Sequence, residues 1–169
     1  NDKSFVVFDN QSQQSSVVAA GLYNPVILKR FTEVWKAKEQ LELALPFYKK
    51  LEVLLDVKLD YKLPVYRRFA SVEEQNEWFT ASDKPNLEDY LSTQLIKNDN
   101  PSIIAPLGFG KVLQTARIDT STLLKHYKVF LKGIDSYCNE TFDYSNLIIE
   151  QDCITYKSIK AKHVVFAEG

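Results

Sequence analysis

Methionine is absent from the 169 residues of this chain, and glycine, cysteine and histidine are scarce, with five, two and two residues. The low glycine count excludes collagen-like proteins, and the mixed pattern of apolar and polar residues excludes long coiled coils and disordered chains. Two cysteines form no disulfide framework, which favours a reducing compartment, so we expect a cytoplasmic protein. No apolar run approaches the roughly 20 residues that a membrane helix needs, so no membrane span is predicted.

The charges of the chain nearly balance, with 21 Lys and Arg against 22 Asp and Glu and a formal net charge of −1. This balance does not favour nucleic acid or an anionic membrane surface as the main partner. Hydrophobic residues make up 45% of the chain, which is ample for a core at this length. The predicted order of strand, helices, antiparallel strands, helix and strands indicates an α/β or α+β fold.

The first half of the chain is predicted to start with a buried strand and continue as helix. Residues 4–8 (Ser-Phe-Val-Val-Phe) form a short apolar run ending at Asp9, which is typical of a parallel strand buried on both faces. Apolar residues recur at steps of three and four over residues 26–56, which predicts a helix. Pro46 inside this pattern predicts a kink or a division into two helices. Residues 61–70 are predicted to be extended.

The second half shows a clear helix start at Ser71, with Glu74 in the capping-box position. Residues 71–100 hold seven acids against two lysines, which indicates a solvated, acidic, partly helical excursion. Residues 101–118 are predicted to be hairpin-like β structure around a Gly108-Phe109-Gly110 turn.

A capped helix is predicted to follow and to end near a C-terminal glycine, Gly133. Its capping residue is Asp119 or Thr120. Strands near residues 141–144, 154–156 and 163–167 complete the pattern.

Asp9 is the clearest candidate for a binding residue. An acid at the end of a parallel strand can accept hydrogen bonds from a ribose diol. Such an acid normally lies about 20 residues after a Gly-rich turn, and no such turn precedes Asp9, so the residues alone favour a simple carboxylate at the start of a loop. Ser15 and Ser16, followed by Ala20 and Gly21, could present hydroxyls and bare backbone to a ligand, although composition favours a helix start with small packing residues.

Other polar residues give weaker indications. Arg67 and Arg68 could hold a carboxylate through an arginine fork, although paired arginines on a strand are more often at the surface. The two histidines and two cysteines share no spacing typical of metal ligands, so no metal site is predicted. These four residues are His126, His163, Cys138 and Cys153.

Two longer stretches carry a family resemblance. Residues 15–26 (SSVVAAGLYNPV) follow the strand that ends in an acid, and residues 161–169 (AKHVVFAEG) end on a small-x-Gly pattern. Together with residues 117–133, they resemble the FAD-dependent oxidoreductases of the D-amino-acid oxidase and glycine oxidase family. Residues 15–26 are similar to the segment just beyond the second Rossmann strand of that family, and residues 161–169 are similar to a later strand that packs against the dinucleotide.

The resemblance implies part of a Rossmann-like FAD-binding domain with an inserted substrate domain of antiparallel sheet and helices. Residues 1–25 and 117–169 would belong to the FAD-binding domain, and residues 26–116 to the substrate domain. The family's first strand, Gly-rich turn and first helix are absent, and so is its C-terminal half. We therefore expect a central fragment that is inactive alone, binds FAD weakly or not at all, and self-associates through unpaired strand edges.

By resemblance, Asp9 would bind the adenosine ribose, and Ser15 and Ser16 would line the cofactor channel. Ala20, Gly21 and Leu22 would pass near the flavin. Ala167 and Gly169 would approach the dinucleotide backbone. The family's substrate is an amine or amino acid, whose carboxylate Arg67 or Arg68 would anchor, and the catalytic residues stay unknown. The alternative is a small α+β module that binds a ligand or a protein without catalysis.

Overall fold

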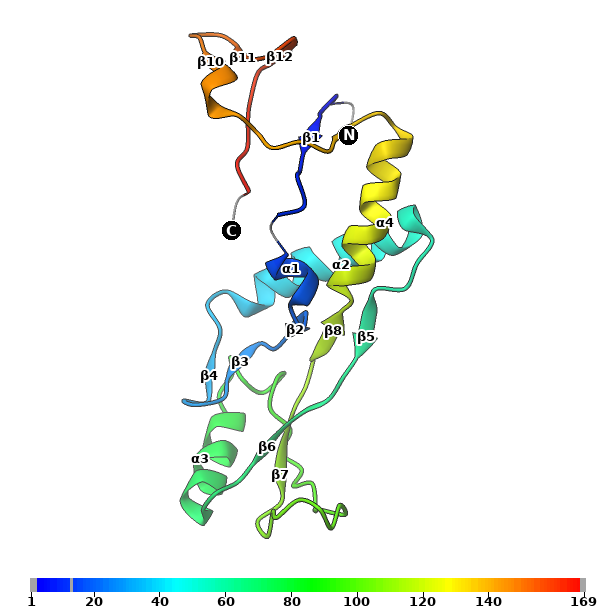
Figure 1. Cartoon of the computed structure of the whole chain (residues 1–169). Helices are drawn as coiled ribbons and strands as arrows, with labels where there is room; N and C mark the ends of the chain where they lie inside the picture. The colour runs from blue at the N-terminus through cyan, green and yellow to red at the C-terminus, as the bar shows by residue number, and fades with distance from the viewer. Residues whose placement is uncertain (1–2, 13, 168–169) are drawn as a thin grey trace. The chain divides into compact units, whose positions relative to one another are not determined.

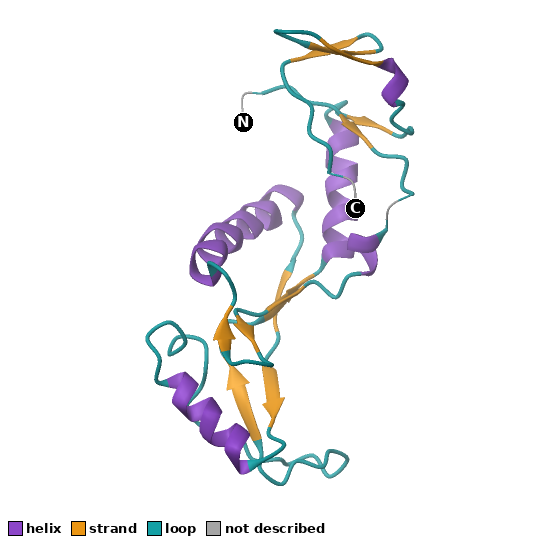
Figure 2. Cartoon of the chain, turned by 90° about the vertical axis from the view of Figure 1, so that its left-hand side faces the viewer, coloured by secondary structure: helices purple, strands orange, loops and turns teal. Residues whose placement is uncertain are grey.

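The computed structural model describes residues 3–12 and 14–167. Its helices and its small, mostly antiparallel sheets confirm a mixed α+β structure (Figures 1 and 2). The chain divides into two compact units: unit 2 is the continuous stretch Ala20–Thr122, and unit 1 contains the residues on either side of it. Among the described residues, no helix has both the length and the apolar character needed to cross a bilayer.

Unit 2 is built around a three-stranded antiparallel sheet in the order β2–β8–β5, with β8 in the centre. The strands are β2 (Leu22–Tyr23), β8 (Ala116–Ile118) and β5 (Asp60–Lys62). Arg117 of β8 lies opposite both Leu22 and Tyr61. Because side chains alternate along a strand, these three residues share one face of the sheet.

The core of unit 2 is centred on Trp78 in helix α3 (Val72–Ser82). The Trp78 ring meets the rings of Phe31 and Phe69 edge to face, at centroid distances of 5.5 and 5.7 Å. Its Nε1 donates a hydrogen bond of 2.9 Å to the carbonyl of Ser92. Gly110 faces the indole so closely that a Cβ there would overlap the ring. Two antiparallel strands flank this core: β6 (Val65–Arg68) and β7 (Phe109–Val112).

The prediction of helix throughout residues 26–56 is only partly right. Helix α2 (Ala37–Leu55) is a single helix that contains Pro46, so a division into two helices is wrong. Before it lies a short hairpin of β3 (Val26–Ile27) and β4 (Thr32–Glu33). Phe31 lies in the hairpin loop with a left-handed φ of +46°, and its ring is buried in the core.

The helix start at Ser71 is confirmed, because its side chain accepts a hydrogen bond of 3.2 Å from the backbone N–H of Glu74. The acidic segment that follows is not a solvated excursion. Leu87 and Leu91 are each 1% exposed and belong to the same cluster as Trp78. The segment therefore supplies core residues along with its charges.

The two strands predicted within residues 101–118 are present but do not form a hairpin with each other. Strand β7 pairs with β6, whereas β8 pairs with β2 and β5. Gly108 has a left-handed φ of +71°, as a turn residue would, but Gly110 lies inside β7.

Unit 1 contains a parallel pair of β1 (Val7–Phe8) and β9 (Tyr137–Cys138). The predicted first strand is thus present, but burial on both of its faces is wrong, because Phe5 is 46% exposed. The other helices are the short α1 (Ser15–Val18) and α4 (Thr120–Gly133), which begins where Asp119 accepts a hydrogen bond of 3.1 Å from the N–H of Thr122.

The last part of unit 1 is a small antiparallel sheet, β10–β11–β12, next to a cluster of aromatic rings. Phe142 stacks on Tyr156 at 4.2 Å and meets Phe8 and Phe166 edge to face. Of the three strands predicted here, the one at residues 154–156 is present, and the one predicted near residues 141–144 lies slightly later, at Leu147–Ile149. Residues 163–167 are not a strand. The elements are η1 (Tyr144–Asn146), β10 (Leu147–Ile149), β11 (Ile154–Tyr156) and β12 (Ile159–Ala161).

Candidate functional site

Asp9 lies in unit 1, directly after the parallel strand β1. Its Oδ1 accepts a hydrogen bond of 2.8 Å from the backbone N–H of Gln11, and its Oδ2 accepts one of 2.9 Å from the hydroxyl of Tyr137. Two hydrogen bonds fix the orientation of this half-buried carboxylate. A carboxylate can accept about four hydrogen bonds, so acceptor positions remain for a ligand.

Tyr137 is held neutral by its surroundings. Burial raises the pKa of its phenol to about 12, and the hydrogen bond to Asp9 and the charge of that carboxylate act in the same direction. The ammonium groups of Lys128 and Lys132 lie 5.1 and 5.6 Å from the Tyr137 ring centroid. The phenol therefore acts as a fixed donor to Asp9 at physiological pH.

The small-residue segment expected to meet the cofactor has two different environments. Ser15 and Ser16 open the short helix α1 in unit 1, and both are exposed. In unit 2, Ala20 is exposed, whereas Gly21 has a φ of +65° and lies against β8, where a Cβ would overlap the carbonyl of Ile118. Packing against β8 is thus sufficient to explain the glycine.

Leu22 begins a row of exposed side chains across the sheet of unit 2. Leu22 is 48% exposed and Tyr61 is 38% exposed, and Arg117 lies between them on β8. The Arg117 guanidinium lies over the Tyr61 ring at 5.5 Å from its centroid, and its Nη2 is 3.6 Å from Oδ2 of Asp119. These contacts hold a cation on an aromatic surface that solvent can reach, and we call Leu22, Arg117 and Tyr61 the exposed row.

The opposite face of the same sheet carries a polar network. The Lys62 ammonium donates hydrogen bonds to the Tyr23 hydroxyl at 3.1 Å and to Oδ2 of Asp60 at 3.0 Å. Tyr23 in turn donates to Oδ1 of Asp60 at 3.1 Å. Burial raises the pKa of Tyr23, while the hydrogen bonds to Tyr23 and Asp60 raise the pKa of Lys62, so both groups keep their protons near neutral pH.

Arg67 and Arg68, the candidate anchors for a substrate carboxylate, already have partners in unit 2. The Arg67 guanidinium forms an ion pair with Glu74 through Nε and Nη2. Arg68 donates a hydrogen bond of 3.3 Å to the carbonyl of Ile104. The Arg67 ion pair joins β6 to α3, which is a structural role.

The remaining candidates add no further polar group to a site. Ala167 is exposed and outside any strand, and Gly169 lies outside the described residues. Within residues 3–12 and 14–167, no group of three or more His, Cys, Asp or Glu side chains could hold a metal ion.

Sequence reasoning missed Tyr61 and Arg117 as candidates. The signal for Arg117 is its place between Ala116 and Ile118, which are 0% and 3% exposed, because a polar residue between two buried ones in a strand points to the other face. Tyr61 has no such signal in the sequence, and only the pairing of β5 with β8 places it beside Arg117.

Comparison with known proteins gives no further assignment. No family model matches the sequence, and no solved structure matches the chain.

Proposed function

We propose that this chain is part of a cytoplasmic FAD-dependent oxidoreductase that oxidises an amine or an amino acid. The observation that carries this proposal is the exposed row of Leu22, Arg117 and Tyr61. Leu22 belongs to the segment that the family resemblance places near the flavin. The row offers an aliphatic side chain, an aromatic ring and a cation on one accessible face.

The residues near β1 fit the adenosine part of FAD. Asp9 follows a strand with a parallel neighbour, and its two hydrogen bonds leave acceptor positions for a ribose diol. The chain returns to pair β9 with β1 after the whole of unit 2. In this proposal, β1 and β9 belong to a Rossmann-like FAD-binding domain, and unit 2 is the inserted substrate domain.

Bound FAD would supply the redox chemistry by accepting a hydride from the carbon that bears the amine, before oxygen or another acceptor reoxidises it. Within unit 2, Arg117 binds the substrate carboxylate, because a guanidinium fork matches a carboxylate with two parallel hydrogen bonds. Asp119 and the Tyr61 ring position this guanidinium. Leu22 and Tyr61 offer apolar surface to the substrate side chain.

The first test is the visible spectrum of the intact protein, purified with any sequence that flanks this chain in its gene. Flavin absorption bands that bleach when amino acids are added without oxygen are expected. A colourless protein that takes up no FAD would overturn the proposal and leave the non-catalytic binding module as the better explanation.

The second test concerns Arg117 and uses the flavin-loaded protein. Arg117→Met is expected to raise KM for amino acids about tenfold or more, because a charge-assisted pair is lost, and to leave KM for amines without a carboxylate unchanged. Arg117→Lys should restore part of the loss. The matched control is Arg30→Met, at an exposed arginine outside the row. Equal KM values for Arg117→Met and the parent protein would refute the assignment of Arg117.

A further inference from the structure

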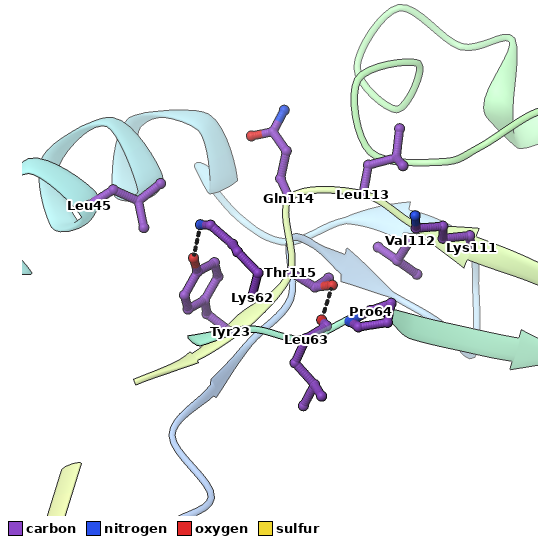
Figure 3. A pocket seen from close by; sticks show the side chains of 10 residues that line it. All are labelled: Tyr23, Leu45, Lys62, Leu63, Pro64, Lys111, Val112, Leu113, Gln114 and Thr115. Carbon is purple, nitrogen blue, oxygen red and sulfur yellow. Dashed lines mark hydrogen bonds between the residues drawn. The ribbon is translucent and has the colours of Figure 1, made fainter. Parts of the chain in front are cut away.

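Helix α2 carries large apolar side chains on the side that faces away from the sheet of unit 2. Its inner side is marked by Leu45, which points toward Tyr23 and Lys62 across a cavity of about 470 Å³ (Figure 3). Residues two positions apart on a helix are turned by about 200° from one another, so Leu43 and Phe47 lie on the outer side. Leu43 is 77% exposed and Phe47 is 57% exposed. Two apolar side chains one helical turn apart are thus left uncovered.

The apolar surface continues along most of the helix. Leu43, Phe47, Lys50 and Leu54 follow one another at steps of four, three and four, which is the spacing of a single helix face. Leu54 is 51% exposed, and Pro46, beside Phe47, is exposed as well. We call Leu43, Pro46, Phe47 and Leu54 the outer stripe. Apolar side chains that gather on one exposed face, rather than being scattered singly, are typical of an interaction site.

The charges beside the outer stripe are divided along the helix. Glu39 and Glu42 lie in its first half and Lys50 in its second half, and all three are exposed. None of the three forms an ion pair with another of the described residues. The other lysines of α2 contribute less to this face, because Lys49 already has an ion pair within the helix and Lys38 lies on the other side. A partner suited to this face carries opposite charges in the same order.

A second copy of α2 that runs antiparallel to the first meets this requirement. When Glu39 of each copy lies opposite Lys50 of the other, the two-fold axis passes close to Leu43 and Pro46. Leu43 of one copy then packs against Pro46 and Phe47 of the other, and the two helix dipoles are antiparallel. A parallel pair would instead place Glu39 beside Glu39 and Lys50 beside Lys50, where like charges repel.

We propose that two copies of this chain form a two-fold dimer through antiparallel α2 helices. The outer stripes make the apolar centre of the contact, and the pairs between Glu39 and Lys50 border it. One helix per copy is a small interface beside the roughly 800 Å² per partner of a standard one, so we expect a dissociation constant of about 10–100 μM. Because Leu45 places α2 on the side of the sheet that carries Tyr23 and Lys62, the dimer leaves the exposed row open. This assignment goes beyond the proposed oxidoreductase function and does not depend on FAD.

The test is sedimentation velocity of the full 169-residue chain, from roughly 2 to 500 μM, with monomer expected at the low end and dimer at the high end. Phe47→Glu should weaken the dimer at least about tenfold, because an apolar ring is lost from the contact. The matched control is Ile104→Glu, at a side chain of unit 2 that is 84% exposed and lies outside α2, and it should leave the dimer unchanged. A chain that stays monomeric throughout this range would overturn the proposal and leave the face to a different protein. Association that Phe47→Glu does not weaken would also overturn it, by placing the contact elsewhere, such as at the strand edges.

Exchange of charges tests the antiparallel orientation. Lys50→Glu should weaken the dimer about tenfold, because two contacts between like charges replace two attractive ones. Glu39→Lys should weaken it by a similar factor, and the double variant Glu39→Lys/Lys50→Glu should restore most of the parent affinity. Circular dichroism of each variant checks that the helices are intact, which we expect because both side chains are exposed. A double variant that dimerises as weakly as the single variants would overturn the proposal.

Discussion

Glu52 connects the end of helix α2 to the start of β5. Its Oε1 accepts hydrogen bonds from the backbone N–H groups of Leu59 at 2.8 Å and Asp60 at 3.0 Å, and its Oε2 accepts one of 3.0 Å from Lys49. The side chain of Glu52 is only 12% exposed. We predict that Glu52→Gln destabilises unit 2 in a pH-dependent way.

The magnitude follows from the pKa of Glu52. The two backbone hydrogen bonds, followed by the one from Lys49, lower this pKa from 4.5 to about 2. That difference corresponds to at most about 3.4 kcal/mol of unfolding free energy. Because Lys49 is 75% exposed and solvent screens this side of the carboxylate, we expect a loss of about 2 kcal/mol at pH 7.

The pH dependence has a defined direction. A carboxylate with a lowered pKa in the folded state stabilises the protein fully above its ordinary pKa of 4.5, and the stabilisation is lost as the pH falls toward 2. The difference in unfolding free energy between the parent protein and Glu52→Gln should therefore shrink from about 2 kcal/mol at pH 7 to near zero at pH 2. Urea unfolding followed by the fluorescence of Trp78, in a Trp35→Phe background, reports on unit 2.

The control is Glu42→Gln, at an exposed glutamate of the same helix, which should change stability by less than about 0.5 kcal/mol. A Glu52→Gln protein as stable as its parent at pH 7 would refute this account of the carboxylate. A difference of unchanged size at pH 2 would show that the amide disturbs packing instead.

Two further predictions concern single contacts. Gly110→Ala should destabilise unit 2 by about 2–3 kcal/mol in urea unfolding, because the new Cβ would lie 2.7 Å from Cδ2 and Cζ2 of Trp78; an unchanged midpoint would show that the indole moves freely. Tyr137→Phe should lower the stability of unit 1 by about 1 kcal/mol by removing the hydrogen bond to Asp9. Spectrophotometric titration should show one phenol ionising near pH 12 that is missing from this variant. The stabilisation from the neutral phenol is present below pH 10 and is lost as the pH rises through 12, so ionisation near pH 10 would contradict the assignment.

Elements with a strong local signal can be predicted from the sequence. The start of α3 at Ser71 and the start of α4 after Asp119 both depend on a side chain and a backbone N–H three residues later. Such contacts lie within one turn of chain. The parallel strand that ends before Asp9 is predictable for a similar reason, because its apolar run is short and continuous.

Elements that depend on distant partners cannot be predicted in this way. Ile27 and Phe31 are four residues apart, as on one face of a helix, but Phe31 reaches the core from a hairpin loop by packing on Trp78. Leu87 and Leu91 belong to a strongly charged segment, and the charge conceals their burial. The amino-acid composition of a segment indicates that most of its side chains are exposed, but it does not reveal which few of them are buried.

The residues of the candidate site likewise include some with a local signal in the sequence and some that depend on distant partners. Asp9 can be proposed from its position after a strand, whereas the ion pair between Arg67 and Glu74 joins a strand to a helix and has no signal in the sequence. The exposed row requires the register of three strands, which brings together residues 22, 61 and 117. That register is set by pairing between segments that are far apart in the chain.

The pairing of β2 with β8 also determines how unit 2 would respond to being cut out or pulled. The chain enters the unit through Gly21 and leaves it beside Ile118, whose N–H donates a hydrogen bond of 2.9 Å to the Gly21 carbonyl. Because the two ends of the unit are adjacent, we expect that its insertion into a surface loop of another protein would not stretch the host. The same geometry makes the unit mechanically weak, because a force applied to its two ends would break the hydrogen bonds between β2 and β8 one after another.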